Sequence, residues 1–311
     1  MVSRPHLARS LISRRRLNGS ITYSNAASSS SGRRWNSSGG VRGGIYSGKE
    51  LSSVYQQLRP AYDEEWADQV LHGMGETNEA SVLDVGAGSL QGSLALAPRV
   101  ARVVAVDRNA EMLLSSGDEA RPDNVEVRVG SAEALPFPEG AADGDEEEQQ
   151  CVDLVLAAQC FHWFDRRKFI AELQRVLRPG GRFVATVYGP AMLFDDERAT
   201  AVARELWERT RDAEPWSAEM VSHYADVKLD PETFCERRVF KRELERRLSF
   251  RGVMQFISTW ALLNSHIVAT GEDKEAILEE VEGQLAEILG ADATDVRVRW
   301  PSSIITWKKI K

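Results

Sequence analysis

From residue 63 to residue 188 the chain alternates short apolar runs with longer segments that are apolar on one side only. Runs such as Val103–Val106 lack the polar alternation of a half-exposed strand, which is typical of parallel strands covered on both faces. The longer segments place apolar residues three and four positions apart, as surface helices do. This pattern predicts strands at 81–86, 102–107, 125–130, 152–158 and 182–188, and helices at 63–71, 94–101, 110–117 and 166–177.

Apolar strands separated by amphipathic helices predict an α/β fold with a doubly wound, mostly parallel sheet. Arg178–Gly181 suits a tight turn, because glycine takes positive φ without strain. Beyond Gly189 we expect residues 191–311 to complete the sheet edge and to form a helical lid, giving seven strands in one domain at 46–311 with its core at 80–190. This second half is predicted to contain strands at 237–250 and 296–310, and helices at 197–210, 253–264 and 273–289.

Residues 1–45 differ from the rest of the chain and are left out of the predicted fold. Residues 1–49 contain eight Arg, one Lys and no acidic residue, and the segment is rich in Ser. Val2, Leu7 and Leu11 could share one face of a short helix. This composition is typical of a mitochondrial presequence, and a disordered basic tail without an address is the alternative. We therefore expect a mitochondrial protein if the segment is a presequence, and a cytoplasmic one otherwise.

The charge and the cysteines exclude several classes of protein. Without residues 1–49 the chain has 30 basic and 47 acidic residues, a balance of -17 that repels phosphate backbones, so we expect no nucleic-acid partner. Cys151, Cys160 and Cys235 form no CxxC pair, which excludes a zinc ribbon and a disulfide framework, and no metal site is expected. No apolar run approaches the roughly 18 residues of a membrane span. Nothing in the sequence indicates an obligate protein partner.

The stretch "SVLDVGAGSLQGSLA" (Ser81–Ala95) predicts a nucleotide-binding loop. A strand, a turn containing Gly86 and Gly88, and a helix place backbone N–H groups at the carboxyl edge of a sheet. Asp107 ends the next strand, where a carboxylate can accept hydrogen bonds from both hydroxyls of an adenosine ribose. Both NAD and S-adenosylmethionine (SAM) enzymes use this arrangement.

Two details favour SAM over NAD. Gln91 breaks the G-x-G-x-x-G pattern of NAD enzymes, and Gly92 comes one place late. Asp84, just before the glycines, would repel a pyrophosphate, whereas SAM carries a sulfonium and an ammonium and has no phosphate. The charge of the loop therefore indicates a SAM site.

Five segments in order, "VLDVGAGSLQG", "VVAVDRNAEML", "VGSAEALPF", "DLVLAAQCFHWFD" and "ELQRVLRPGGRFV", resemble the class I SAM-dependent methyltransferases. The matched part is the methyltransferase type 11 core, at 80–187. "VYQQLRPAY" and "AAQCFHWFD" are similar to the trans-aconitate-methyltransferase-like branch of small-molecule enzymes. "FISTWALL" and "SSIITWKK" extend the similarity over nearly the whole chain after Tyr46.

The resemblance implies a role for each matched residue. Asp84, Gly86 and Gly88 would line the methionine portion of the cofactor. Asp107 would hold the ribose, with Arg108 beside it. The remaining implied roles are adenine contacts for Ser131, Ala132 and Glu133, a position facing the transferred methyl for Ala158 and Gln159, and closure over the cofactor for Tyr55 and Arg59.

The sequence departs from the family pattern in three places. Leu90 stands where the family has a third glycine, and its side chain is expected to narrow the approach to the cofactor, with Gly92 as the candidate replacement in a longer turn. Asp63 stands where the branch has proline. The acidic stretch Glu139–Gln150 is longer than the usual turn and is expected to be a solvated surface loop.

Two residues after the fourth predicted strand could take part in chemistry. His162 is the candidate general base or substrate-orienting group, and Gln159 is taken with it as a catalytic candidate; packing of the "HWF" segment is the alternative. Cys160 could pair with His162 as a nucleophile, but no oxyanion pattern accompanies it, which favours a small core cysteine. A carboxylate acceptor would need no base.

Three further residues are candidates for binding the acceptor. Arg59 could clamp a carboxylate, or be an ordinary surface arginine. Trp163 and Trp260 could line the acceptor pocket, or pack in the core.

The resemblance implies carboxyl O-methylation of an aconitate-like organic acid or another small molecule. Three alternatives stay open: a ubiquinone-type ring methyltransferase in mitochondria, an NAD-dependent oxidoreductase, and a non-catalytic protein that keeps the fold. Leu90 is the only feature that supports the last of these.

Overall fold

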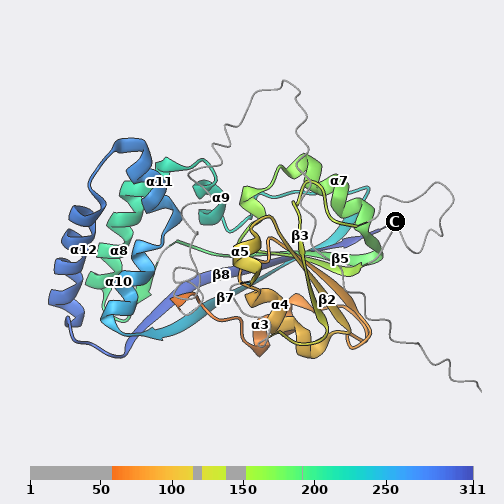
Figure 1. Cartoon of the computed structure of the whole chain (residues 1–311), viewed down its shortest axis with the longest axis horizontal. Coiled ribbons are helices and arrows are strands. Elements are labelled where there is room, and N and C mark those ends of the chain that lie inside the picture. Colours follow the sequence, from red (N-terminus) through yellow and green to blue (C-terminus); the bar gives the residue numbers. More distant parts are fainter. Residues whose placement is uncertain (1–57, 115–120, 138–151, 191, 311) are drawn as a thin grey trace, which may run out of the picture. The chain divides into compact units, whose positions relative to one another are not determined.

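The computed structural model describes residues 58–114, 121–137, 152–190 and 192–310 (Figure 1). The predicted boundary at residue 45, the acidic stretch and Tyr55 lie outside these residues. The described strands are β1 (Ser81–Val85), β2 (Arg102–Asp107), β3 (Val125–Val129), β4 (Val152–Ala158), β5 (Leu177–Tyr188), β6 (Leu193–Phe194), β7 (Phe234–Leu248) and β8 (Val296–Lys309). The described helices are α3 (Glu64–Val70), α4 (Gln91–Leu96), α5 (Ala110–Leu114), α7 (Arg166–Val176), α8 (Glu197–Thr210), α9 (Ser217–Val221), α10 (Phe250–Ser258), α11 (Ala261–Thr270) and α12 (Lys274–Leu289), with 3-10 helices η1 (Ala97–Arg99), η2 (Phe161–Trp163) and η3 (Arg211–Ala213).

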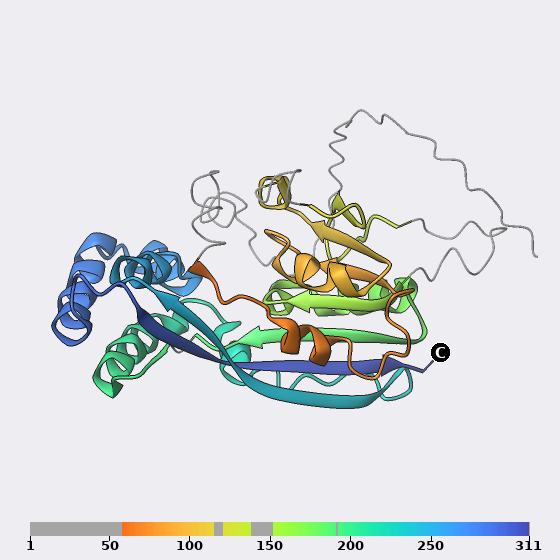
Figure 2. The ribbon, with the colours of Figure 1, turned by 90° about the horizontal axis from the view of Figure 1, so that it is seen from below.

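The described strands form one sheet in the order β3-β2-β1-β4-β5-β8-β6, with β7 also paired to β8. β1 to β5 are parallel, and β8 runs antiparallel to β5, β6 and β7. β5 and β6 share one edge of β8, because β7 occupies the other edge along its whole length. Figure 2 shows β7 and β8 as two long strands that run alongside each other as a two-stranded ribbon. The predicted mostly parallel α/β sheet is confirmed, with the short β6 added to the seven expected strands.

Both faces of the parallel sheet are covered. Leu83 of β1 belongs to the same buried cluster as Phe169 of α7, whereas its neighbour Val82 belongs to a second cluster with Trp66 of α3. Successive side chains of a strand point to opposite faces, so α7 and α3 cover different faces of the sheet. This is the doubly wound arrangement that the unbroken apolar strands predict.

Asp63 begins α3 where the branch has proline. Its carboxylate accepts a hydrogen bond from the backbone N–H of Trp66 (2.8 Å), which satisfies a donor in the first helical turn. The same Oδ1 accepts from Arg242 of β7 at 2.7 Å. The departure is therefore accommodated by an N-cap that also joins α3 to the edge of the sheet.

Two predicted helices have the wrong bounds. The helix expected at 94–101 begins at Gln91 and turns into the 3-10 helix η1 from Ala97, because Pro98 lies in its first turn. The helix expected at 253–264 is two helices, α10 and α11, separated at Trp260, whose backbone is extended (φ -61, ψ 125). The Thr259 hydroxyl donates to the carbonyl of Phe256 at 2.7 Å, so it takes a carbonyl at the end of α10.

The turn expected at Arg178–Gly181 is a four-residue bulge within β5. The register moves from Val152 opposite Leu177 to Leu154 opposite Arg182, so these four residues have no strand-pairing partner in β4. Gly180 has φ +78, the positive value that the turn was predicted to need.

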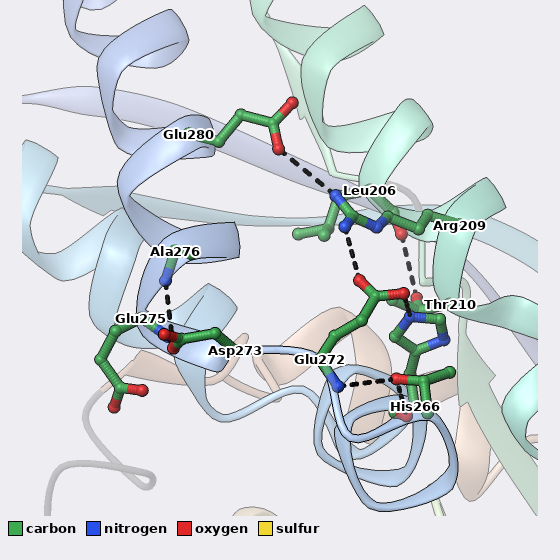
Figure 3. A network of polar contacts seen from close by, with 10 residues as sticks. Leu206, Arg209, Thr210, His266, Glu272, Asp273, Glu275, Ala276 and Glu280 are labelled. Atoms are coloured by element: carbon green, nitrogen blue, oxygen red, sulfur yellow. Dashed lines mark hydrogen bonds and ion pairs between the residues drawn. The ribbon is translucent and has the colours of Figure 1, made fainter.

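Helices α8, α10, α11 and α12 gather beyond one end of the β7–β8 ribbon (Figure 1). Arg209 of α8 binds Glu272 (2.5 Å) and Glu280 (3.3 Å), and Glu272 also contacts His266 of α11 at 3.2 Å (Figure 3). These contacts join α8 to the α11–α12 connection, and α10 and α11 then supply one wall of the site described below. Of the helices described, none has both the length and the apolar character that crossing a bilayer requires.

Candidate active site

A cavity of about 670 Å³ opens where β1, β2 and β4 end. Its lining comes from the segments that follow these strands, and from η2, α9, α10, α11 and β8. Cavities of roughly 300–1,000 Å³ are typical of small-molecule sites, and open parallel sheets bind ligands at the carboxyl ends of their strands.

The glycine loop after β1 is fixed to the end of β2. The N–H groups of Gly86 and Ala87 donate to the carbonyl of Val106 at 2.7 and 3.1 Å. Gly86 has φ +71, and a Cβ there would lie 2.8 Å from Cβ and Sγ of Cys160. The predicted cofactor residues Gly86 and Gly88 both line the cavity, and only glycine fits the first position without a shift.

Asp107 presents its carboxylate to this loop. Oδ2 accepts from the backbone N–H of Gly88 (2.9 Å) and Oδ1 from that of Asn109 (2.8 Å). Burial raises the pKa of Asp107, while these N–H groups and Arg108 oppose the rise. Each oxygen keeps a second lone pair, so both can still accept from the ribose hydroxyls. Asp107 and Arg108 line the cavity together, in the positions that their predicted roles require.

The predicted adenine-binding residues Ser131, Ala132 and Glu133 line the cavity beyond Asp107. The backbone N–H of Glu133 donates to Oγ of Ser131 (3.1 Å), and its Oε1 accepts from the backbone N–H of Asp165 (2.9 Å). The Glu133 carboxylate therefore holds the loop against the start of α7, and its contact with adenine stays a prediction.

Asp84 lies behind the glycine loop and is not among the cavity-lining residues. Oδ2 accepts from the Ser93 hydroxyl at 2.7 Å, and the buried Oδ1 has no partner. Burial, and next Asp107, raise the pKa of Asp84 to about 6, against the Ser93 hydrogen bond. A Cβ on Gly92 would come within 3.1 Å of Asp84 Oδ2, so Gly92 makes room for this carboxylate. The longer turn expected here is wrong, because Gly92 lies inside α4. A Cβ on Gly92 would also lie 3.0 Å from Leu156 of β4, so this residue allows the close approach of helix to strand that a third glycine provides.

The expectation that Leu90 narrows the cavity is also wrong. Its side chain is fully buried in a cluster with Ala105 and Leu113 and does not line the cavity. The effect of the missing glycine lies in the backbone, because Leu90 has φ +66 as the residue before α4. Left-handed backbone of this kind costs a side chain roughly 1–2 kcal/mol.

Gln159 follows β4 with a left-handed backbone, φ +58. Its side-chain N–H donates to the carbonyl of Tyr188 (3.2 Å), which fixes the amide orientation, and the buried Oε1 has no partner. Gln159 lines the cavity whereas Ala158 does not. The position facing the transferred methyl therefore stays a prediction for Gln159 alone.

Arg59 lies among aromatic rings in the part of the cavity that Tyr188 of β5 and Trp300 of β8 line. Arg59 donates to the hydroxyls of Tyr188 (3.2 Å) and Thr259 (3.4 Å), and its Cζ lies 4.9 Å from the ring centroid of Phe256. The predicted pocket residue Trp260 lines the same wall and is only 7% exposed. Arg59 is therefore a cation held at the cavity, as its predicted role requires.

His162, Trp163 and Cys160 line the opposite wall. Nδ1 of His162 lies 2.7 Å from the hydroxyl of Tyr224, and burial together with Arg166 lowers the pKa of His162 to about 3. An imidazole that is this hard to protonate is a weak general base. Cys160 donates to the carbonyl of Val85 (3.0 Å), and burial raises the pKa of its thiol, which fits the core-cysteine interpretation.

Several lining residues carry no signal in the sequence. Trp216 and Met220 come from the region around α9, and Trp300 comes from β8, more than 100 residues after the glycine loop. Each could equally be an ordinary core residue. Only the sheet topology brings them to the cavity.

The residues present fit an adenosyl cofactor without a phosphate. Asp107 offers two acceptors for a ribose, and Gly86 leaves space that a Cβ would fill. The unpaired Asp84 oxygen behind the loop would repel a phosphate and attract a cationic group.

Residues 83–185 match the family model of the methyltransferase domain. A solved structure of a protein classed as a type II methyltransferase, from Anaeromyxobacter dehalogenans, is 30% identical with a TM-score of 0.61, over 80% of this chain and 97% of that one. The chain belongs to the class I SAM-dependent methyltransferases. A protein classed as a methyltransferase from Dictyostelium discoideum is 24% identical over 83% of this chain and 93% of its own length. An uncharacterized methyltransferase of Schizosaccharomyces pombe is 34% identical over 41% of this chain and 47% of its own length.

In this methyltransferase, Leu90→Gly is expected to be at least as stable as Leu90→Ala. Both variants lose burial worth about 2–5 kcal/mol, but glycine also relieves the left-handed backbone, whereas inside a helix it is normally about 1 kcal/mol worse than alanine. Urea unfolding measures both, and titration calorimetry with SAM should show little change. A glycine variant less stable than the alanine variant by about 1 kcal/mol would contradict the strained backbone.

Asp84 is expected to make the methyltransferase less stable as the pH rises. Its raised pKa means that the folded protein holds this proton more tightly than the unfolded chain, so stability falls between about pH 4 and pH 6, by roughly 3 kcal/mol in total. Asp84→Asn keeps an acceptor for Ser93 and cannot ionise. The difference in unfolding free energy, variant minus wild type, should therefore grow through this range, and parallel pH profiles would rule the effect out.

Proposed function

We propose that this methyltransferase transfers a methyl group from SAM to a carboxylate oxygen of a small organic acid, of the aconitate-like kind acted on by the branch it resembles. One observation carries the proposal: acidic and cationic groups lie in a defined order along the carboxyl edge of the sheet. Asp107 ends β2, Gln159 follows β4, and Arg59 contacts Tyr188 of β5.

The order of the strands in the sheet sets the approximate distances between these groups. Neighbouring strands lie about 4.8 Å apart, so the end of β4 is roughly 10 Å from that of β2, because β1 lies between them. A cofactor whose ribose is bound by Asp107 can thus place its methyl near Gln159. The next strands, β5 and β8, then lie under the acceptor, where Arg59 supplies a positive charge, whereas Arg108 lies beside Asp107.

A carboxylate suits this end of the cavity. SAM supplies a methyl group that is already activated on a sulfonium. The protein then has to bind the acid, align it and exclude water, and alignment alone can supply much of the rate. Arg59 pairs with carboxylates through parallel N–H donors, and the rings of Phe256 and Trp260 close the wall around it. A carboxylate also needs no base, in keeping with the weak basicity of His162.

One observation favours a second candidate, methylation of a hydroxylated aromatic ring of the ubiquinone type. Trp163 and Trp216 lie 4.5 Å apart, centroid to centroid, with their planes inclined at 52°, and form an aromatic wall of the cavity. Ring hydroxyls need a general base, so this candidate requires a base that the acid does not.

A panel of acceptors separates the two. Aconitate-like acids, aromatic monocarboxylic acids and catechols are incubated with SAM, and the products are identified by mass spectrometry; esters are then recognised by mild alkaline hydrolysis. We expect methyl esters of acids. Arg59→Met should raise KM for the acid at least about tenfold, since a charged hydrogen bond contributes about 1.5–3 kcal/mol. Arg204→Met, at an exposed position of α8, is the matched control. Methylation of catechols alone, or an unchanged KM in the Arg59 variant, would refute the proposal.

A further inference from the structure

The hydroxyl of Tyr224 faces the imidazole ring of His162. Tyr224 is fully buried just after α9 and has left-handed backbone, φ +56. Its oxygen lies 2.7 Å from Nδ1 of His162. The preceding His223 is left-handed as well, and contacts the Ser303 hydroxyl at 3.1 Å. Both residues are thereby held in a backbone conformation that side chains rarely adopt.

This geometry fixes which nitrogen of His162 carries the proton. The buried hydroxyl of Tyr224 needs an acceptor for its proton, because a buried donor without one costs about 1–3 kcal/mol. The described surroundings offer Nδ1, and burial raises the pKa of Tyr224, which keeps the phenol protonated. A neutral imidazole with an accepting Nδ1 carries its proton on Nε2. His162 is therefore a hydrogen-bond donor to the cavity that it lines.

Burial and the neighbouring Arg166 keep the imidazole ring of His162 neutral. Arg166 of α7 pairs with Glu219 of α9, and its guanidinium lies 4.9 Å from the centroid of the Phe161 ring. From η2 and the segment before α9, Trp163 and Trp216 pack against the imidazole with centroids 5.3 and 4.8 Å away. Burial and Arg166 both lower the pKa of His162.

We propose that Tyr224 is a positioning residue that fixes His162 as an Nε2–H donor to the acceptor's carboxylate, and so restricts the enzyme to nucleophiles that need no proton removed. The identity of the acceptor in this inference rests on the proposed function, whereas the tautomer of His162 does not. A ring already protonated at Nε2 cannot take a proton from a hydroxyl in the cavity. Phenols and alcohols are then poor acceptors even where they fit the aromatic wall.

Two substitutions at His162 separate a donor from a base. His162→Gln offers an amide N–H near the position of the Nε2–H and cannot act as a base, whereas His162→Leu offers neither. With the acid methylated by the wild type, we expect the leucine variant to raise KM at least about tenfold and the glutamine variant to recover most of that loss. A general base would instead cost both variants roughly 10²–10⁴ in kcat. SAM affinity, measured by calorimetry, should be retained in both.

Nitrogen-15 NMR of the histidine rings tests the tautomer without any turnover. His162→Gln identifies the signals of His162. The wild type should show a protonated Nε2 and a bare Nδ1 throughout about pH 5 to 8, and Tyr224→Phe should show a mixture of tautomers with a raised KM and a nearly unchanged kcat. Protonation at Nδ1, or titration of the ring within that range, would overturn the inference. A protonated Nε2 in an enzyme that neither binds nor methylates acids would refute the proposed function, and the carboxylate-positioning role of Tyr224 with it. Methylation of acids by an enzyme whose His162 is protonated at Nδ1 would refute this inference alone.

Discussion

Asp107→Ala is expected to weaken SAM binding at least about 100-fold, because it removes two charge-assisted hydrogen bonds to the ribose, each worth about 1.5–3 kcal/mol. It also frees the N–H groups of Gly88 and Asn109, so the loop that contacts the cofactor loses its support. Both effects act in the same direction. Titration calorimetry with SAM and S-adenosylhomocysteine measures the loss.

Two further variants make this result specific. Asp107→Asn keeps one oxygen for a backbone N–H and is expected to bind with intermediate affinity. Asp292→Ala removes an exposed carboxylate of the α12–β8 connection and should bind like the wild type. Urea unfolding checks that each variant is folded. Full affinity in a folded Asp107→Ala variant would show that the ribose is held elsewhere.

Gly86→Ala is expected to destabilise the fold by about 2–5 kcal/mol and to reduce SAM affinity. The left-handed backbone at φ +71 costs a side chain roughly 1–2 kcal/mol, and the new Cβ, 2.8 Å from Cβ and Sγ of Cys160, forces a shift that typically costs about 1–3 kcal/mol. Because Cys160 and Gly86 both line the cavity, that shift changes the shape of the cofactor site.

Gly271→Ala is the matched control for the backbone. Gly271 ends α11 with φ +74, and a Cβ there would meet nothing within 4 Å. This variant should lose only the backbone part, roughly 1–2 kcal/mol, and bind SAM normally. Equal losses of stability in the two variants would mean that Cys160 moves freely and that the close approach is unimportant.

The sequence predicted the regular part of the fold well, because there local pattern and tertiary structure agree. β2 and β4 have the predicted bounds, as does α8, since each has an uninterrupted apolar or helical pattern. The prediction failed where side chains compete with the backbone. Thr259 and Trp260 divide a mostly apolar segment, and periodicity does not detect such a break.

For the site, the sequence predicted what lies next to a motif. Gly86, Gly88 and Asp107 follow strands whose carboxyl ends share one edge, so their convergence follows from topology. Leu90 was misinterpreted because a missing glycine was judged by side-chain size, whereas the structure turns the side chain into the core. Tyr224 was not predicted, because its contact with His162 spans 62 residues.

The central claim is that one cavity places the adenosine of SAM over β2 and the reacting methyl beside β4. A crystal structure with S-adenosylhomocysteine and an organic acid tests it most directly. The account predicts ribose hydroxyls on the Asp107 carboxylate, the sulfur next to Gln159, and the acid between Arg59 and His162. A ribose bound away from Asp107, or a sulfur directed away from the end of β4, would contradict it.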